Sequence, residues 1–285
     1  MVMKIGLALG GGGARGGAHL GVLYELRALG LKPDLITGTS IGGLVGAFAA
    51  TGMEVEVIED FLREISLSSL LTLPSSSQPS LIGNSKGRSI ITNFIGSPTF
   101  SDLKIPTAVV TVDLVSRHQV ILDEGDLVTA LLATTAFPII APPVEIEGMV
   151  LVDGGLINNV PFDVARARGA THVIAVDIGH SVPFGQQAQD PPPPMPGLLG
   201  KAISVIQQRP IWQVVAAVAD IVAANGVNGR LAISPPDIMI QPKNNRVGMF
   251  DFHRMDESIE AGRKAARAVA PELEKLVTMR AKLRG

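Results

Sequence analysis

The chain has 285 residues, of which 46% are hydrophobic and 18% are charged, and its formal net charge is −2. A chain this close to neutral, with only 4% aromatic residues, offers neither a basic surface nor stacking platforms for nucleic acid. The absence of cysteine excludes disulfides, thiolate zinc sites and a cysteine nucleophile.

Short apolar runs alternate with helical patterns along the first 180 residues. The expected elements, in chain order, are a strand at 4–9, a helix at 16–29, a strand at 35–36, helices at 41–50 and 54–65, a flexible loop at 66–80, strands at 105–114 and 119–122, a helix at 127–135, a strand pair at 144–152 with a turn at Gly148, a helix at 162–168 and a strand at 171–178. Strands that alternate with helices predict an α/β domain with a largely parallel sheet.

The remainder of the chain has a different pattern. Residues 181–197 include four consecutive prolines and are expected to form an extended loop. Residues 198–285 are mostly helical, with one strand at 237–241 and a helix at 255–283, and we expect them to pack on the same domain.

One apolar run, residues 211–224, is relevant to whether the protein associates with a membrane. It is shorter than the roughly 20 residues that span a bilayer and carries Asp220, so a buried or surface-docked helix is favoured over a membrane-contacting one. Since no targeting segment stands out, a cytoplasmic protein is expected, either free or peripherally bound to a membrane.

A run of glycines follows the first strand. Residues 10–13 are all glycine, followed by Ala14, Arg15 and Gly16. Consecutive glycines let backbone N–H groups converge, and a helix that begins there adds its positive dipole end. Such a loop can hold a phosphate or the oxyanion of an acyl transfer, whereas a simple strand-to-helix turn needs fewer glycines.

Nucleotide binding is an alternative for this loop. Gly11, Gly13 and Gly16 match the dinucleotide fingerprint, but the acid at a suitable distance, Asp34, would open the second strand rather than end it. The phosphate loop of kinases does not fit either, because Gly17 and Ala18 stand where Lys and Ser or Thr are needed.

A second motif, Gly38-Thr39-Ser40-Ile41-Gly42, lies between a short strand and a helix. This is the setting of a nucleophile elbow, in which a sharp turn exposes the serine hydroxyl. A serine helix cap in a glycine-rich turn is the alternative. The glycine loop some two dozen residues earlier favours Ser40 as a nucleophile.

The base that would accept the Ser40 proton is expected to be Asp153. It ends an apolar strand and enters a turn with Gly154 and Gly155, so partial burial could raise its pKa enough for direct proton transfer. An ordinary Asp–Gly turn is the alternative. Asp113 and Asp177 also end strands and are expected to be structural. No motif surrounds any histidine, whose positions are His19, His118, His172, His180 and His253.

Taken together and in this order, the motifs resemble the three signature motifs of patatin-like phospholipases. The segments that carry the resemblance are Gly11-Gly12-Gly13-Ala14-Arg15-Gly16, Gly38-Thr39-Ser40-Ile41-Gly42 and Asp153-Gly154-Gly155, and Ala133-Thr134-Thr135-Ala136-Phe137-Pro138 is similar to the proline-bearing block before the family's aspartate. The resemblance covers residues 4–180, and the combination is specific although each motif alone is weak.

The resemblance implies a three-layer α/β/α fold and lipid acyl hydrolysis by a Ser–Asp dyad, with residues 4–180 as the catalytic core. Ser40 would be the nucleophile and Asp153 the base. Gly11, Gly12 and Gly13 would supply oxyanion N–H groups, and Arg15 would steady the glycine loop or bind a substrate phosphate. No metal or organic cofactor is required.

Two rival functions stay open at this point. One is a binding or regulatory protein on the same fold with little activity, and the other is a nucleotide-dependent enzyme. The sequence also leaves open the lipid head group, the oligomeric state and whether the acyl group passes to water or to another alcohol.

Overall fold

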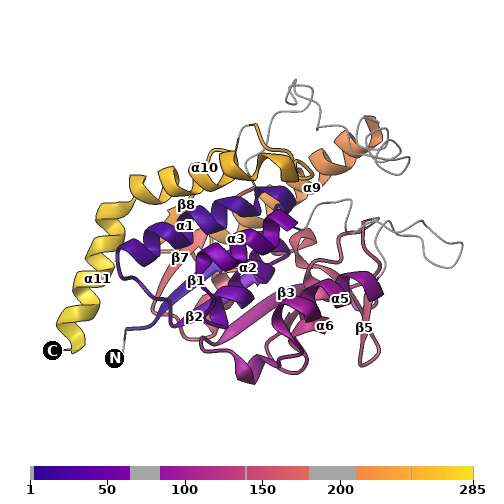
Figure 1. Ribbon diagram of the computed structural model, residues 1–285, viewed down its shortest axis with the longest axis horizontal. Coiled ribbons are helices and arrows are strands. Elements are labelled where there is room, and N and C mark those ends of the chain that lie inside the picture. The colour runs from indigo at the N-terminus through magenta and orange to yellow at the C-terminus, as the bar shows by residue number, and fades with distance from the viewer. Residues whose placement is uncertain (1–2, 65–83, 139, 180–209, 245, 285) are drawn as a thin grey trace, which may run out of the picture.

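The computed structural model describes residues 3–64, 84–138, 140–179, 210–244 and 246–284. The loops expected at 66–80 and 181–197 lie outside these residues. Within them the chain forms a mixed sheet with helices on both faces (Figure 1). The three-layer α/β/α fold expected from the sequence is therefore confirmed.

Eight strands form the sheet in the order β5-β6-β3-β2-β1-β7-β8, with β4 paired to β3 outside this path. Neighbouring strands among β1, β2, β3, β7 and β8 pair in parallel, whereas β4, β5 and β6 pair antiparallel. The strands are β1 (Ile5–Leu9), β2 (Leu35–Thr39), β3 (Thr107–Asp113), β4 (Gln119–Leu122), β5 (Val144–Ile146), β6 (Met149–Asp153), β7 (His172–Val176) and β8 (Ile238–Ile240).

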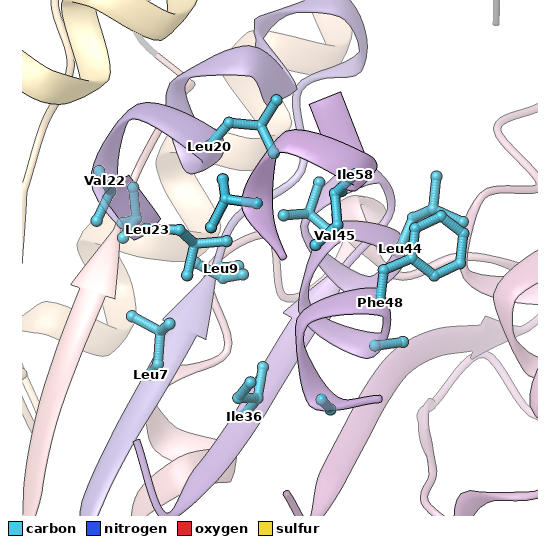
Figure 2. Packing of buried hydrophobic residues seen from close by; sticks show 14 of the residues in the cluster. Leu7, Leu9, Leu20, Val22, Leu23, Ile36, Leu44, Val45, Phe48 and Ile58 are labelled. Atoms are coloured by element: carbon cyan, nitrogen blue, oxygen red, sulfur yellow. The ribbon is translucent and has the colours of Figure 1, made fainter. Parts of the chain in front are cut away.

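One face of the sheet carries most of the hydrophobic core. Leu7 and Leu9 of β1 and Ile36 of β2 point towards helices that cover this face (Figure 2). The helices packed here are α1 (Gly17–Ala28), α2 (Ile41–Ala50), α3 (Val55–Glu64), α5 (Asn84–Ile95), α6 (Leu127–Thr134), α10 (Met255–Ala268) and α11 (Ala270–Arg284). Because side chains alternate along a strand, Ala8 faces the other side.

The opposite face is covered by α7 (Phe162–Ala167) and α9 (Pro210–Leu231). Ala8 and Leu35 of the sheet pack with Phe162 of α7 and Val227 of α9. Short 3-10 turns complete the structure at η1 (Gly13–Gly16), η2 (Phe100–Asp102), η3 (Gly154–Leu156) and η4 (Phe252–Arg254).

The C-terminal part differs from expectation at two places. The helix expected at 255–283 is two helices, α10 and α11, which meet at Val269. Pro271 explains the break, because proline has no N–H to donate and its ring clashes with the carbonyl four residues earlier. The strand expected at 237–241 is present as β8 and extends the sheet beyond β7.

Helix α9 is longer and more exposed than expected. It has 22 residues and lies, in Figure 1, at the end of the molecule away from the chain termini. Among its apolar side chains, Val218 is 52% and Ile221 is 60% exposed, so the helix is not buried. By length and composition alone, the stretch Val214–Leu231 could cross a membrane, and 6% of it is buried in the fold.

Candidate active site

The three sequence motifs meet at the C-terminal ends of the central parallel strands β1 and β2. β1 and β2 are parallel neighbours, so the glycine loop after Leu9 and Ser40 after Thr39 emerge side by side. Thr39 pairs with Val110 of β3, and the next β3 residue, Thr111, pairs with Asp153 of the antiparallel β6. Ser40 and Asp153 therefore lie level with each other on either side of β3.

Ser40 occupies a strained turn between β2 and α2. Its backbone has φ 55° and ψ −128°, a combination that side-chain-bearing residues rarely adopt. The turn is held by Thr134, whose Oγ1 accepts a hydrogen bond from the Ser40 N–H (3.0 Å) and donates one to the Val110 carbonyl (2.6 Å). Ser40 is half-buried and lines a cavity, which is the setting expected of a nucleophile elbow.

The glycines that flank Ser40 allow this turn. A Cβ at Gly42 would lie 2.3 Å from the Leu9 carbonyl oxygen, and one at Gly38 would lie 2.5 Å from the Gly43 Cα. A side chain at either position would push α2 away from the strands.

Asp153 is 2% exposed and lines the same cavity as Ser40. Its Oδ1 also accepts the Gly155 N–H at 2.8 Å, within the η3 turn that Gly154 begins. Burial raises the pKa of Asp153 to about 6, although hydrogen bonds from Ser40 and Gly155 act in the opposite direction. The carboxylate is thus a stronger base than a solvated aspartate.

The glycine loop is fixed through its carbonyl groups. Buried side chains donate to three consecutive carbonyls: His19 Nε2 to Gly10 (2.7 Å), Asn159 Nδ2 to Gly11 (3.2 Å) and Arg15 Nε to Gly12 (3.1 Å). A peptide unit is planar, so a fixed carbonyl also fixes the N–H of the following residue. Burial lowers the pKa of His19 to about 4, which keeps its ring neutral at ordinary pH.

This geometry corrects the expected set of oxyanion donors. The Gly11 N–H donates to the Asn159 carbonyl at 3.1 Å, so it is not available to an oxyanion. The N–H groups of Gly12 and Gly13 have no acceptor among the described residues, and both glycines line the same cavity as Ser40. Of the three N–H groups expected as oxyanion donors, those of Gly12 and Gly13 therefore remain as candidates.

Arg15 is engaged by the protein itself. The side chain is 1% exposed, and besides Gly12 it donates to the Gly179 carbonyl (3.0 Å) and to Asp220 Oδ1 of α9 (2.7 Å). Of the two roles expected for Arg15, the structure fits the steadying of the loop. Gly16 ends η1 against Ile41, where an added Cβ would lie 2.3 Å from Ile41 Cγ1.

A cavity of about 210 Å³ opens beside Ser40 and Asp153. Its charged lining residues are Arg15, Asp153 and Asp220. Most of the other lining residues are apolar: Ile41, Leu44, Leu62, Ile90, Ile91, Leu132, Phe137, Ile140, Ala141, Leu156, Ala219, Ala223, Met249, Phe250 and Phe252. Because Arg15 is already paired with Asp220, the cavity suits a hydrocarbon chain rather than a charged group.

Sequence reasoning missed three residues that build this site. Asn159 lies six positions after Asp153, and His19 lies just inside the helix that follows the glycine loop. Neither has a motif around it. Asp220 did carry a signal, because an acid inside an apolar helix needs a partner when it turns inward.

Comparison with known proteins places this site in context. A family model described as patatin-like phospholipase matches residues 7–166. An uncharacterised NTE family protein of Mycobacterium tuberculosis is 31% identical over 273 residues, which cover 93% of this chain and 46% of that protein. Human patatin-like phospholipase domain-containing protein 6 is 37% identical over 185 residues, covering 61% of this chain and 13% of that protein.

The fold also matches a solved structure. VipD from Legionella pneumophila superimposes with a TM-score of 0.60 at 13% sequence identity, over 96% of this chain and 67% of that one. The chain spans less than half the length of the mycobacterial and human relatives.

Proposed function

Because this chain belongs to the patatin-like phospholipase family, we propose that it is a serine hydrolase that cleaves acyl esters of lipids. One observation carries the proposal. A strained serine, Ser40, and the buried carboxyl group of Asp153, whose pKa burial raises, line the same apolar cavity. Family membership and the relatives' names support lipid as the substrate class.

The proposed reaction has two steps. Asp153 accepts the Ser40 proton while Oγ attacks the ester carbonyl, and the alcohol leaves with the proton from Asp153 to give an acyl-enzyme. Asp153 then takes a proton from water, the hydroxide releases the acid, and Ser40 regains its proton. A base with a pKa near 6 is ionised at neutral pH and still basic enough for this role.

The N–H groups of Gly12 and Gly13 would stabilise the oxyanion that forms in both steps. Each donor of this kind contributes on the order of 3 kcal/mol to lowering the barrier. Their orientation is set in the free protein, since Asn159 and Arg15 hold the two carbonyls concerned. Preorganisation of this kind is what makes such donors effective.

The surroundings of the cavity support a substrate drawn from a lipid phase. Ala219 and Ala223 of α9 line the cavity, while Val218 and Ile221 of the same helix face outward. In this proposal the outer face of α9 contacts a membrane or micelle peripherally, and the acyl chain passes beside the helix. A cytoplasmic protein that binds membranes reversibly would have this property.

Labelling and lipid hydrolysis test the proposal. The wild-type protein should react with a fluorophosphonate probe and release fatty acid from a mixed lipid extract, whereas Ser40→Ala should do neither. A wild-type protein that fails to label would favour a binding or regulatory role on the same fold. Hydrolysis that survives in Ser40→Ala would place the nucleophile elsewhere.

A further inference from the structure

We infer that Asp220 of α9 is a positioning residue for the glycine loop, which carries the proposed oxyanion donors Gly12 and Gly13, and that it acts through Arg15. This inference deepens the proposed function and rests on it. Asp220 is 205 positions from Arg15 in the chain and belongs to no sequence motif. Its carboxylate is the acidic partner of the side chain that holds the Gly12 carbonyl.

The contacts of Arg15 form a relay from α9 to the loop. Nη2 donates to Asp220 at 2.7 Å, Nη1 donates to the Gly179 carbonyl at 3.0 Å, and Nε donates to the Gly12 carbonyl at 3.1 Å. A guanidinium is planar and rigid, so fixing its two terminal nitrogens also fixes the direction of Nε–H. Asp220 supplies the only negative charge in this set of contacts.

The orientation of the Gly12 carbonyl has a direct chemical consequence. The Gly12 carbonyl and the Gly13 N–H belong to one planar trans peptide and point in opposite directions. While Arg15 holds the carbonyl, the Gly13 N–H points away from Arg15, and among the described residues it has no acceptor. If the guanidinium is released, the Gly12–Gly13 peptide can rotate, since glycine tolerates a wide range of backbone angles.

The polar groups of α9 fit a positioning role better than a general anchoring role. Asp220 is the only charged residue between Pro210 and Gly229, and its side chain is 18% exposed. The helix has a separate anchor at its C-terminal end, where Arg230 donates to Asp163 (3.2 Å) and to the Ile157 carbonyl (2.8 Å). Holding α9 in place therefore does not require an acid beside the glycine loop.

The test compares two esters that differ in the atom that enters the oxyanion hole. One substrate is a soluble short-chain ester, and the other is its thionoester, in which sulfur replaces the carbonyl oxygen. Sulfur is a weak hydrogen-bond acceptor, so the oxygen ester gains far more from the loop. For Asp220→Asn we expect kcat/KM for the oxygen ester to fall on the order of tenfold or more, and for the thionoester much less.

Two further variants separate positioning from structure. Asp220→Glu keeps the charge and should recover part of the preference for the oxygen ester. Asp163→Asn weakens the other anchor of α9 and should leave that preference within about twofold of wild type, since it does not touch Arg15. Thermal unfolding measured on each variant establishes that the kinetics come from folded protein.

Each outcome decides the question. An oxygen-to-sulfur preference that is unchanged in folded Asp220→Asn would overturn the inference, and so would an equal loss in Asp163→Asn. If Asp220→Asn does not fold, Asp220→Glu provides the same test. Its carboxylate keeps the charge but is displaced, so its preference for the oxygen ester over the thionoester should be lower than that of the wild type. If wild-type protein hydrolyses neither ester, or Ser40→Ala hydrolyses both, the proposed function itself fails.

Discussion

Asn159 and Gly11 exchange two hydrogen bonds across the candidate active site. The Gly11 N–H donates to the Asn159 carbonyl at 3.1 Å, and Asn159 Nδ2 donates to the Gly11 carbonyl at 3.2 Å. Asn159 belongs to the segment that follows Asp153, so this pair of hydrogen bonds joins the glycine loop to the strand end that carries the proposed base. The fixed Gly11 carbonyl in turn orients the Gly12 N–H.

Removal of the Asn159 side chain should lower catalysis in addition to stability. Asn159→Ala is expected to reduce kcat about tenfold or more, because the Gly12 N–H loses its fixed direction. Asn158→Ala is the matched control: its side chain is also buried and hydrogen-bonded, but to Gln119 and Asp163 rather than to the glycine loop. Each variant should lose on the order of 1–3 kcal/mol of unfolding free energy.

Kinetics and urea unfolding on both variants check this. If the two kcat values fall equally, Asn159 contributes only to folding.

The sequence could predict where the glycine loop and Ser40 lie, because both follow short apolar runs that end in glycine. It could not predict how Asp153 reaches Ser40. That contact depends on β6 pairing antiparallel with β3 so that Asp153 pairs with Thr111, and cross-strand register involves residues far apart in the chain. The sequence also could not predict the hydrogen bond from the Gly11 N–H to the Asn159 carbonyl, since the two residues are 148 positions apart.

Helix α9 shows the same limit for exposure. An apolar run has the same sequence pattern whether the helix is buried or exposed. Only the packed structure shows that Val218 and Ile221 face outward. The break at Val269 could have been predicted, because Pro271 was visible in the expected helix.

A side chain at Gly12 should abolish most of the activity. An added Cβ at this position would lie 2.9 Å from Ile178 and 3.4 Å from Arg15 Nε, so the loop must shift. Gly12→Val is expected to reduce kcat roughly a hundredfold or more, as loss of an oxyanion donor does. Gly229→Val is the control, because a Cβ there meets nothing within 4 Å. Near-normal turnover in folded Gly12→Val would remove the loop from the mechanism.

The pH dependence should report the ionisation of Asp153. A base must be unprotonated to accept the Ser40 proton, so kcat/KM should rise with pH through about 6, the raised pKa of this carboxyl, and then level off. The midpoint should hardly move with temperature, as is usual for carboxylic acids. A midpoint that falls markedly on warming would indicate an imidazole instead.

The same pKa shift predicts a pH-dependent cost in stability. The pKa of Asp153 rises from 3.8 to about 6 on folding, so the folded state binds the proton more tightly. Stability from this group is full below about pH 4 and is lost as pH rises through about 6, a difference of roughly 3 kcal/mol.

Asn at this position has no charge to bury. The unfolding free energy of Asp153→Asn relative to wild type should therefore increase between pH 4 and pH 8, as measured by urea titration at each pH. A difference that stays constant across this range would show that Asp153 titrates normally in the folded protein.

The last prediction is that Ser40 and Asp153 act as one unit and that no histidine transfers the proton. Asp153→Asn should reduce kcat/KM almost as far as Ser40→Ala, and the double variant should be little worse than either single one, because losses within one catalytic unit do not add. His253→Gln and His172→Gln should keep most of the activity. Their rings lie on η4 and at the start of β7, and neither lines the cavity. All five variants would be assayed on one soluble ester, with folding checked by circular dichroism. A folded histidine variant reduced by about a thousandfold, beside an active Asp153→Asn, would replace the dyad with a Ser-His-Asp arrangement.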